Sequence, residues 1–131
     1  MTVLDSSAVI DFLLGLEAAP AVEEILTTEG EAAAPDLLVF EVLAVIRRDA
    51  LRDVIGAERA TAAITDLADL SVALFATLPL SPRAWELRAN LSAADALFVA
   101  LAEALAEPLA TKDRGLGRAA VEHADVEVIV L

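Results

Sequence analysis

Short apolar runs of strand type alternate with helical stretches along the chain, and this alternation limits the possible folds more than any other feature. The strand-like runs lie at residues 2–4, 32–34, 71–77, 108–111 and 126–131. The helical stretches lie at residues 6–14, 20–28, 36–51, 56–69, 81–90, 92–106 and 113–121. Strands that alternate with helices of about 10–15 residues are typical of βαβ units. The sequence therefore predicts an α/β fold, with a central mostly parallel β-sheet flanked by helices on both faces, in one domain spanning residues 1–131.

The amino-acid composition limits the kinds of core and of metal site that the chain can form. The apolar fraction is 58% and the aromatic fraction only 4%, so we expect a core of Ala, Leu, Val and Ile, with Trp85 either in that core or at a dimer interface. The chain has no cysteine, which excludes disulfides and thiolate metal sites and fits a reducing cytoplasm. The single histidine, His123, excludes any site that needs two. We expect no signal peptide and no membrane span, because no leader-like segment and no apolar stretch of about 18–20 residues is visible.

Four acidic residues stand in apolar surroundings and give the strongest functional signal. Asp5 and Asp113 follow predicted strands, and Glu41 and Asp95 are each the only charge in a run of ten residues. An ionised carboxylate in desolvated surroundings is costly unless a cation lies beside it. Four that converge would repel one another and attract a divalent metal ion. The pattern indicates metal-assisted phosphodiester chemistry, with these four acids as candidate catalytic and metal-binding residues.

Each acid alone also has a structural interpretation. Asp5 and Asp113 are of a type that caps helices, and Asp95 falls in a first helical turn, where it would complement the helix dipole. Glu41 lies in a helix that is apolar on every face, which predicts burial of the whole helix, with a narrow solvent-facing seam as the alternative. Asp11 is ambiguous, because it lies six residues beyond Asp5, about 240° around a helix, and should not share its face.

The net charge of −13, from 22 acidic and 9 basic residues, limits the partners. A protein that binds nucleic acid by itself usually carries a basic face, because phosphate neutralisation supplies much of the affinity. Either nucleic acid is not the substrate, or the few basic residues are gathered near the site. Strong acidity also suits a basic protein partner.

Around the four acids the chain resembles a PIN domain, and specifically the VapC-type toxin group, over nearly all of its length. The matching segments, in chain order, are residues 3–10, 35–42, 91–105 and 108–116. Each motif alone is weak, whereas four in the right order and at the right separations are specific.

Two positions depart from the pattern of that group. Ala94 precedes the third acid, where tyrosine is common, and Ala106 follows the third segment, where glycine is usual. A left-handed helix cap at an alanine costs on the order of 1 kcal/mol, so we expect a different turn after residue 105.

The resemblance implies a metal-dependent endoribonuclease, the toxin of a type II toxin–antitoxin system, which hydrolyses RNA phosphodiester bonds through a water activated by Mg²⁺ or Mn²⁺. Asp5, Asp95 and Asp113 would contact the metal directly or through water, and Glu41 would bind a water or a second metal. The side chains expected to support these ligands are Ser6, Ser7 and Thr111. The bases expected to hold the RNA backbone are Lys112, Arg114 and Arg118, with Arg47, Arg48 and Arg52 as second choices.

The resemblance also implies two protein partners. One is a cognate VapB-like antitoxin, whose basic side chain would enter the acidic pocket, and the other is a second copy of the chain in a homodimer. The net charge of −13 suits a basic partner at low salt.

Two other classes of function remain open. A non-catalytic PIN-like binding module would keep the fold, and the shortage of basic residues favours it. A receiver-like phosphoacceptor domain also carries acids at strand ends and binds Mg²⁺. It would need a pair of acids in its first loop, where Ser6 and Ser7 follow Asp5.

Overall fold

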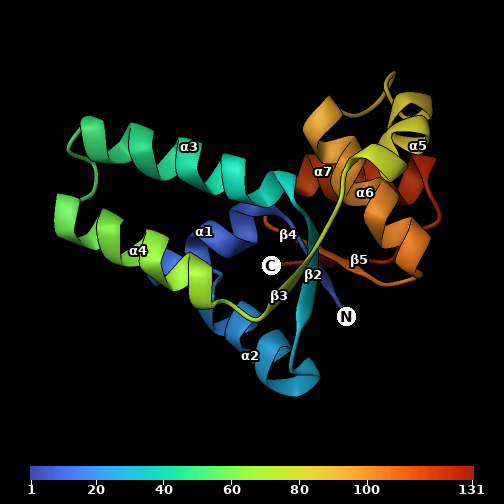
Figure 1. Ribbon diagram of the computed structural model, residues 1–131. Coiled ribbons are helices and arrows are strands. Elements are labelled where there is room, and N and C mark those ends of the chain that lie inside the picture. The colour runs from blue at the N-terminus through green and yellow to red at the C-terminus, as the bar shows by residue number, and fades with distance from the viewer.

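A sheet of five parallel strands forms the centre of the structure, a computed structural model that describes all of residues 1–131. The strands lie in the order β3-β2-β1-β4-β5 (Figure 1). Their bounds are β1 (Val3–Leu4), β2 (Ala32–Pro35), β3 (Val72–Phe75), β4 (Leu109–Thr111) and β5 (Val128–Val130). The predicted α/β fold with a mostly parallel sheet is confirmed, since every strand pair is parallel.

Seven α-helices connect the strands. They are α1 (Ser6–Leu14), α2 (Ala19–Glu29), α3 (Leu37–Leu51), α4 (Ala57–Asp69), α5 (Ser81–Glu86), α6 (Ala93–Leu105) and α7 (Arg114–His123), with a short 3₁₀ helix, η1 (Leu78–Leu80), before α5. None of these helices is both long enough and apolar enough to cross a membrane.

The strand order decides which helices cover which face of the sheet. From β1 the chain adds β2 and β3 on one side and then crosses to add β4 and β5 on the other. Because crossovers between parallel strands are right-handed, this reversal places the later helices on the opposite face. Figure 1 accordingly shows α1 to α4 on one side of the sheet and α5 to α7 on the other. The predicted helical layers on both faces are confirmed.

The core is built mainly from small and aliphatic side chains, as the composition predicts. In β2, Ala32, Ala33 and Ala34 are fully buried, and α6 packs directly on this strand and on β1. Side chains this small let a helix approach the sheet closely, and the only large aromatic ring in the buried core, Phe98 of α6, fills the space beside them. The position of α6 matters for the site because its first turn carries Asp95.

Local signals set several helix ends. Gly15 ends α1 with a left-handed backbone (φ 65°), and the Ser92 hydroxyl caps α6 by accepting a hydrogen bond from the Asp95 amide at 3.1 Å. The expectation of a different turn after α6 is wrong. Ala106 closes α6 in the left-handed conformation (φ 53°), so the turn is kept even though glycine is absent.

Three further expectations are corrected. The helix predicted over residues 81–90 ends at Glu86, and Trp85 lies outside the core with 67% of its surface exposed. The helix that carries Glu41 is not buried on every face, since Phe40 is 69% exposed and Leu43 is also exposed. Helical periodicity shows that a face is apolar, but a neighbouring element is needed to bury it.

Candidate active site

The two acids that follow strands are brought together by the sheet order. Asp5 follows β1 and Asp113 comes two residues after β4, and these strands are neighbours in parallel register. The Asp5 amide donates to the Ala110 carbonyl of β4 at 3.2 Å. The sheet reverses its order between these two strands, and in open α/β sheets ligands bind at such a point, beyond the carboxyl ends of the strands.

Asp5 is held by three hydrogen-bond donors. Its Oδ1 accepts from the Ser7 hydroxyl at 2.7 Å and from the Ala8 amide at 3.0 Å, and its Oδ2 accepts from the Thr111 hydroxyl. Only 5% of the residue is exposed. Asp5 therefore caps α1 and faces the candidate site at the same time, so the two interpretations drawn from the sequence are compatible.

The same two hydroxyl groups tie Asp5 to the turn after β4. The Ser7 Oγ accepts from the Lys112 amide at 3.3 Å, and the Thr111 Oγ1 accepts from the Asp113 amide at 2.9 Å. Because each hydroxyl accepts from an amide, its own proton is free to point at Asp5. Ser7 and Thr111 thus link the first and fourth acids through hydrogen bonds. Asp113 itself caps α7 by accepting from an amide in the first turn at 3.0 Å.

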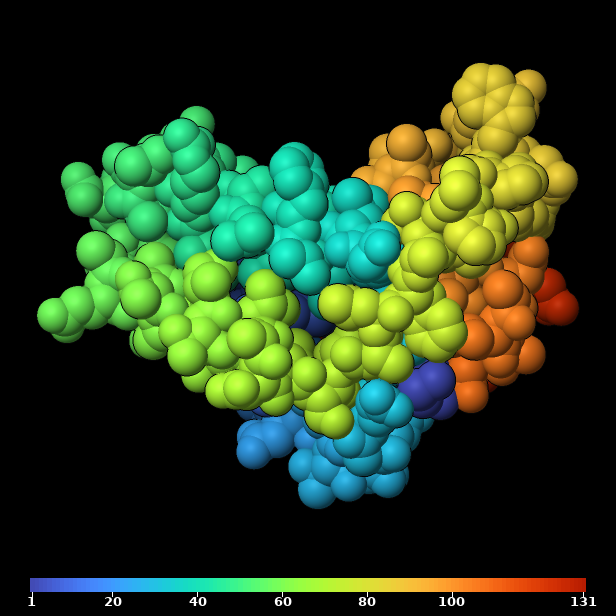
Figure 2. All heavy atoms as spheres, in the orientation of Figure 1, coloured from blue at the N-terminus to red at the C-terminus, as the bar shows by residue number.

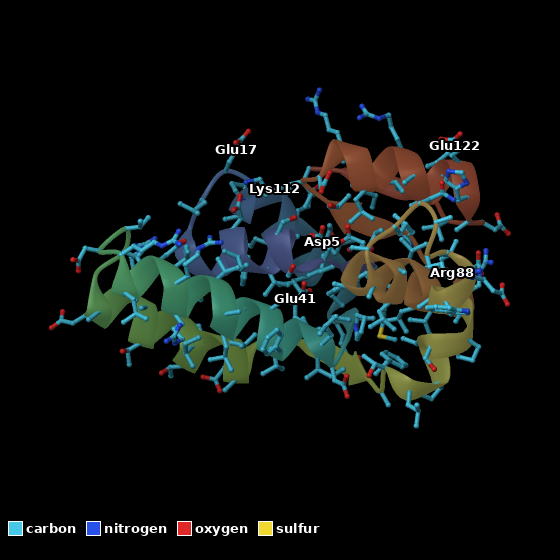
Figure 3. The ribbon with its side chains drawn as sticks, turned by 90° about the horizontal axis from the view of Figure 1, so that it is seen from above. Asp5, Glu17, Glu41, Arg88, Lys112 and Glu122 are labelled. Atoms are coloured by element: carbon cyan, nitrogen blue, oxygen red, sulfur yellow. The ribbon has the colours of Figure 1, made fainter.

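Glu41 and Asp95 reach the site from two helices on opposite faces of the sheet. Glu41 lies on α3, which begins directly after β2, and Asp95 lies in the first turn of α6. The view from above in Figure 3 shows Asp5 and Glu41 near each other where α1, α3, α6 and α7 come together. The Glu41 Oε1 atom is buried and has no hydrogen-bond partner, the only such side-chain atom in the protein. An unpaired buried oxygen of this kind is costly, and it is available to accept a hydrogen bond or to bind a cation.

The electrostatics show that the four carboxyl groups share one region. Burial raises the pKa of Asp5, Glu41 and Asp95 above their ordinary values, and neighbouring hydroxyl groups only partly oppose this. Neighbouring carboxylates raise these pKa values further: Asp113 acts on Asp5 and Asp95, and Asp5 and Asp95 act on Glu41. Charge interactions fall off with distance, so mutual effects of this kind require proximity. None of the four acids forms a salt bridge.

The donor set fits a hard divalent cation. All candidate ligands are carboxylate oxygens, which Mg²⁺ and Mn²⁺ prefer, and the Glu41 Oε1 atom lacks any other partner. No three of the acidic side chains lie close enough together to enclose an ion directly. That spacing suits a cation that keeps several of its waters and contacts some carboxylates through them, as Mg²⁺ usually does.

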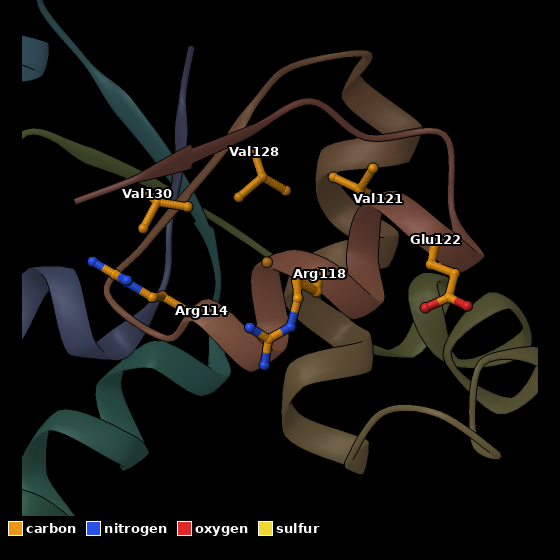
Figure 4. Close-up of a pocket in the computed structure, with 7 residues that line it drawn as sticks. Arg114, Arg118, Val121, Glu122, Val128 and Val130 are labelled. Carbon is orange, nitrogen blue, oxygen red and sulfur yellow. The ribbon is translucent and has the colours of Figure 1, made fainter.

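The bases near the fourth acid fall into two kinds. The Lys112 ammonium is 2.8 Å from the Asp11 Oδ2 atom, and this contact raises its pKa. Arg114 and Arg118 form no ion pair and line a groove of about 670 Å³ between α7 and β5. Figure 4 shows both guanidinium groups projecting from α7, with Val128 and Val130 of β5 beside them.

Sequence reasoning did not find the partner of Asp11. This carboxylate is 4% exposed and pairs with a residue 101 positions later in the chain. A lone charge in the apolar run of residues 8–13 was the available signal. The sequence pattern alone does not show which cation lies opposite.

Residues 2–122 match the PIN domain family, and the chain therefore belongs to that family. It is 42% identical over 121 residues to Ribonuclease VapC1 of Mycobacterium tuberculosis, a match that covers 89% of each chain. It is 33% identical over 129 residues to Ribonuclease VapC12 of the same organism, covering 98% of this chain and 99% of the relative. It is 36% identical over 129 residues to VapC ribonuclease Mb0985 of Mycobacterium bovis, covering 98% of each. The resemblance to VapC-type PIN domains is confirmed.

Proposed function

We propose that this protein is a divalent-metal-dependent endoribonuclease and the toxin of a type II toxin–antitoxin pair. The observation that carries the proposal is the group of four mutually repelling carboxylates around a buried, unpartnered Glu41 oxygen. The relatives named as VapC ribonucleases support it. The function divides into three roles, namely holding the cation, supporting its ligands and holding the RNA.

Asp5, Asp95 and Asp113 would hold the cation, directly or through water, and Glu41 would bind a water or a second cation. When bound, Mg²⁺ or Mn²⁺ supplies positive charge that stabilises the charge developing on the phosphate and makes water more acidic. The water oxygen forms a bond to phosphorus as the bond to the 3′ oxygen breaks, which leaves a 5′-phosphate and a 3′-hydroxyl. The Glu41 Oε1 atom, which has no donor of its own, is available to accept a hydrogen bond from the attacking water.

Ser7 and Thr111 would orient Asp5 through their hydroxyl groups, because each donates to one of its oxygens. Ser6 begins α1 beside them and lies near enough to Glu41 to favour its ionised form. Groups that orient a ligand in this way typically contribute about 10–100-fold in metal affinity or activity.

A direct assay tests the proposal. The purified protein should cleave a structured RNA with Mn²⁺ or Mg²⁺, and EDTA should stop the reaction. Asp5→Asn and Asp95→Asn should each reduce turnover by about 100-fold or more, while Glu58→Gln, which removes an exposed acid of α4, should leave it unchanged. Cleavage that persists in EDTA, or in both Asp variants, would refute the proposal.

Arg114 and Arg118 are the proposed contacts for the RNA backbone, since both are exposed, unpaired and close in sequence to Asp113. Replacing either with Met should weaken RNA binding and reduce the slope of log affinity against log salt by about one. Filter binding at several salt concentrations, with the uncleaving Asp5→Asn protein as background, measures both. An unchanged slope in both variants would place the RNA elsewhere.

The specific observation that favours a non-catalytic binding module is the net charge of −13. Calorimetric titration with Mn²⁺ separates the two functions, because an inert module has no need to keep the site. Saturable Mn²⁺ binding that is lost in Asp5→Asn supports the nuclease, and absence of binding supports the module.

Two partners complete the proposed function. A basic antitoxin would complement the four acids, none of which forms a salt bridge, and a second copy of the chain would form a homodimer. Exposed apolar side chains such as Phe40 and Leu43 on α3 are compatible with protein partners, because they leave apolar surface in water. Size-exclusion chromatography with light scattering should show a dimer at micromolar concentration, and a monomer alone would count against it.

A further inference from the structure

Asp11 is a buried carboxylate outside the group of four acids. It lies on α1, with 4% of its surface exposed, and its Oδ2 atom accepts from the Ala18 amide at 2.9 Å and from the Lys112 ammonium at 2.8 Å. An ionised carboxylate at this depth is stable only while its cationic partner stays in place. Lys112 is the one base that pairs with it.

Lys112 is attached to α1 at two points, one through its backbone and one through its side chain. Its amide donates to the Ser7 hydroxyl in the first turn of α1 at 3.3 Å, and its ammonium reaches Asp11 one turn further on. Figure 3 places Lys112 beside the loop after α1 that carries Glu17, to one side of Asp5. Lys112, which lies between β4 and Asp113, therefore contacts α1 at both Ser7 and Asp11.

The two contacts of Lys112 with α1 affect the proposed site because Thr111 and Asp113 flank Lys112 in the chain. Thr111 donates to Asp5, and Asp113 donates through its amide to the Thr111 hydroxyl. A turn held at Lys112 keeps both neighbours in register with Asp5. If Lys112 swung out to a phosphate, Asp11 would be left buried without a cation, which is strongly unfavourable.

We propose that Asp11 and Lys112 form a clamp that fixes the turn between β4 and α7 against α1, and so sets the position of Asp113 relative to Asp5. Both are positioning residues, and Lys112 is not a contact for RNA. Their effect on turnover rests on the proposed nuclease function, whereas their effect on the turn does not.

Steady-state kinetics give the first test. Lys112→Met removes the ammonium and keeps an apolar stem, and Asp11→Asn removes the charge and keeps the shape. Each should lower kcat about 10-fold with KM for RNA unchanged, and the double variant should be no worse than the poorer single variant. Lys112→Arg should recover most of the loss, because it restores a cation opposite Asp11. Arg88→Met, which removes an exposed base just after α5, is the matched control and should change neither kcat nor KM.

Salt dependence separates the clamp from an RNA contact. If Lys112 acts in the clamp, Lys112→Met should leave the slope of log RNA affinity against log salt the same as in the parent protein. If Lys112 instead touched a phosphate, the variant would show a raised KM, an unchanged kcat and a slope smaller by about one. That result would overturn the proposal.

Amide hydrogen exchange gives a test that needs no activity. The Lys112 and Asp113 amides donate to hydroxyl groups within the clamped turn, so both should exchange at least about 10-fold faster in Lys112→Met and Asp11→Asn. Exchange in the middle of α4 should stay unchanged. If the parent protein cleaves no RNA but these amides respond, the nuclease proposal fails and the clamp stands. Unchanged exchange in both variants refutes the clamp whatever the activity.

Discussion

At the scale of single residues, the candidate site is organised by side chains that serve two purposes. Asp5 caps α1 and also presents a carboxylate to the acidic centre. Thr111 accepts from the Asp113 amide and donates to Asp5, and it is fully buried. A residue that looks like an ordinary cap or strand end is therefore also a functional candidate, because the caps lie where the strands end.

Thr111→Val tests this double role. The substitution keeps the shape but removes the hydroxyl, which leaves the Asp113 amide and one Asp5 oxygen without a partner. We expect a loss of about 1–3 kcal/mol in the free energy of unfolding and a fall in turnover of about 10–100-fold. Thr61→Val, on the exposed surface of α4, is the control and should cost less than about 0.5 kcal/mol. Urea unfolding measures both, and equal effects at the two positions would contradict the role of Thr111.

The raised pKa values predict how pH acts on stability. The ordinary values are 3.8 for Asp5 and Asp95 and 4.5 for Glu41, and burial raises all three in the folded protein. A folded protein that holds protons more tightly than the unfolded chain is favoured at low pH. Their contribution is therefore fully present below the ordinary values and is lost as pH rises through the raised ones.

The measurement is a difference between two proteins. The triple variant Asp5→Asn, Glu41→Gln, Asp95→Asn should become more stable relative to the parent protein as pH rises. Urea unfolding without divalent metal, from pH 4 to pH 8, gives the free energy of unfolding of both proteins. The comparison is needed because Glu103, whose pKa is lowered by Arg83, acts in the opposite direction in both proteins. A constant difference across this range would show that the three carboxyl groups are not destabilised by burial.

At the scale of elements, the clearest departure is the end of α6. Ala106 adopts a left-handed backbone that suits glycine, and its amide still bonds back to the Ala102 and Glu103 carbonyls. The chain accepts this strain because β4 must begin within a few residues and pair with β1. The helix end is thus decided by where the next strand lies.

Replacing Ala106 with Gly should relieve that strain. We expect a gain of about 0.5–1 kcal/mol in the free energy of unfolding, because the left-handed penalty exceeds the extra entropy of the unfolded chain. The control is Ala104→Gly, in the exposed part of the same helix, which should cost about 1 kcal/mol. Chemical unfolding measures both, and destabilisation at position 106 would show that the backbone there is unstrained.

At the scale of the whole molecule, the protein carries a net charge of −13, and four of its 22 acidic residues lie near one another. Figure 2 shows a notch on the upper surface between α3 and the region of α5 and α6. General screening of the charge and specific binding of a cation should both stabilise such a protein, but by different amounts.

Comparison of MgCl₂ with NaCl at equal ionic strength separates the two effects. Both salts should raise the melting temperature, and MgCl₂ should add about 2.7 kcal/mol of further stability when it is present at 100 times its Kd. The additional effect should disappear in Asp5→Asn and on addition of EDTA. Equal stabilisation by both salts would mean that no specific divalent site exists.

Much of the fold could be predicted from local sequence. The bounds of α1 follow from Asp5 and Gly15, and the start of α6 follows from Ser92, because caps act within a few residues. The exposure of Trp85 and Phe40 could not be predicted in this way, since an apolar residue is buried only if another element covers it. The end of α5 at Glu86 also escaped prediction, because no glycine or proline marks it.

The amino-acid sequence by itself determined the order of strands and helices, the parallel sheet, and the four acids as candidates, because these depend on periodicity, caps and spacing along the chain. Only the tertiary structure decided that Lys112 is held by Asp11 while Arg114 and Arg118 are free, and that one Glu41 oxygen is buried without a partner. These are contacts between residues far apart in sequence. They exist only once the crossing from β3 to β4 has placed β4 beside β1, and no local pattern encodes the distance between two such side chains.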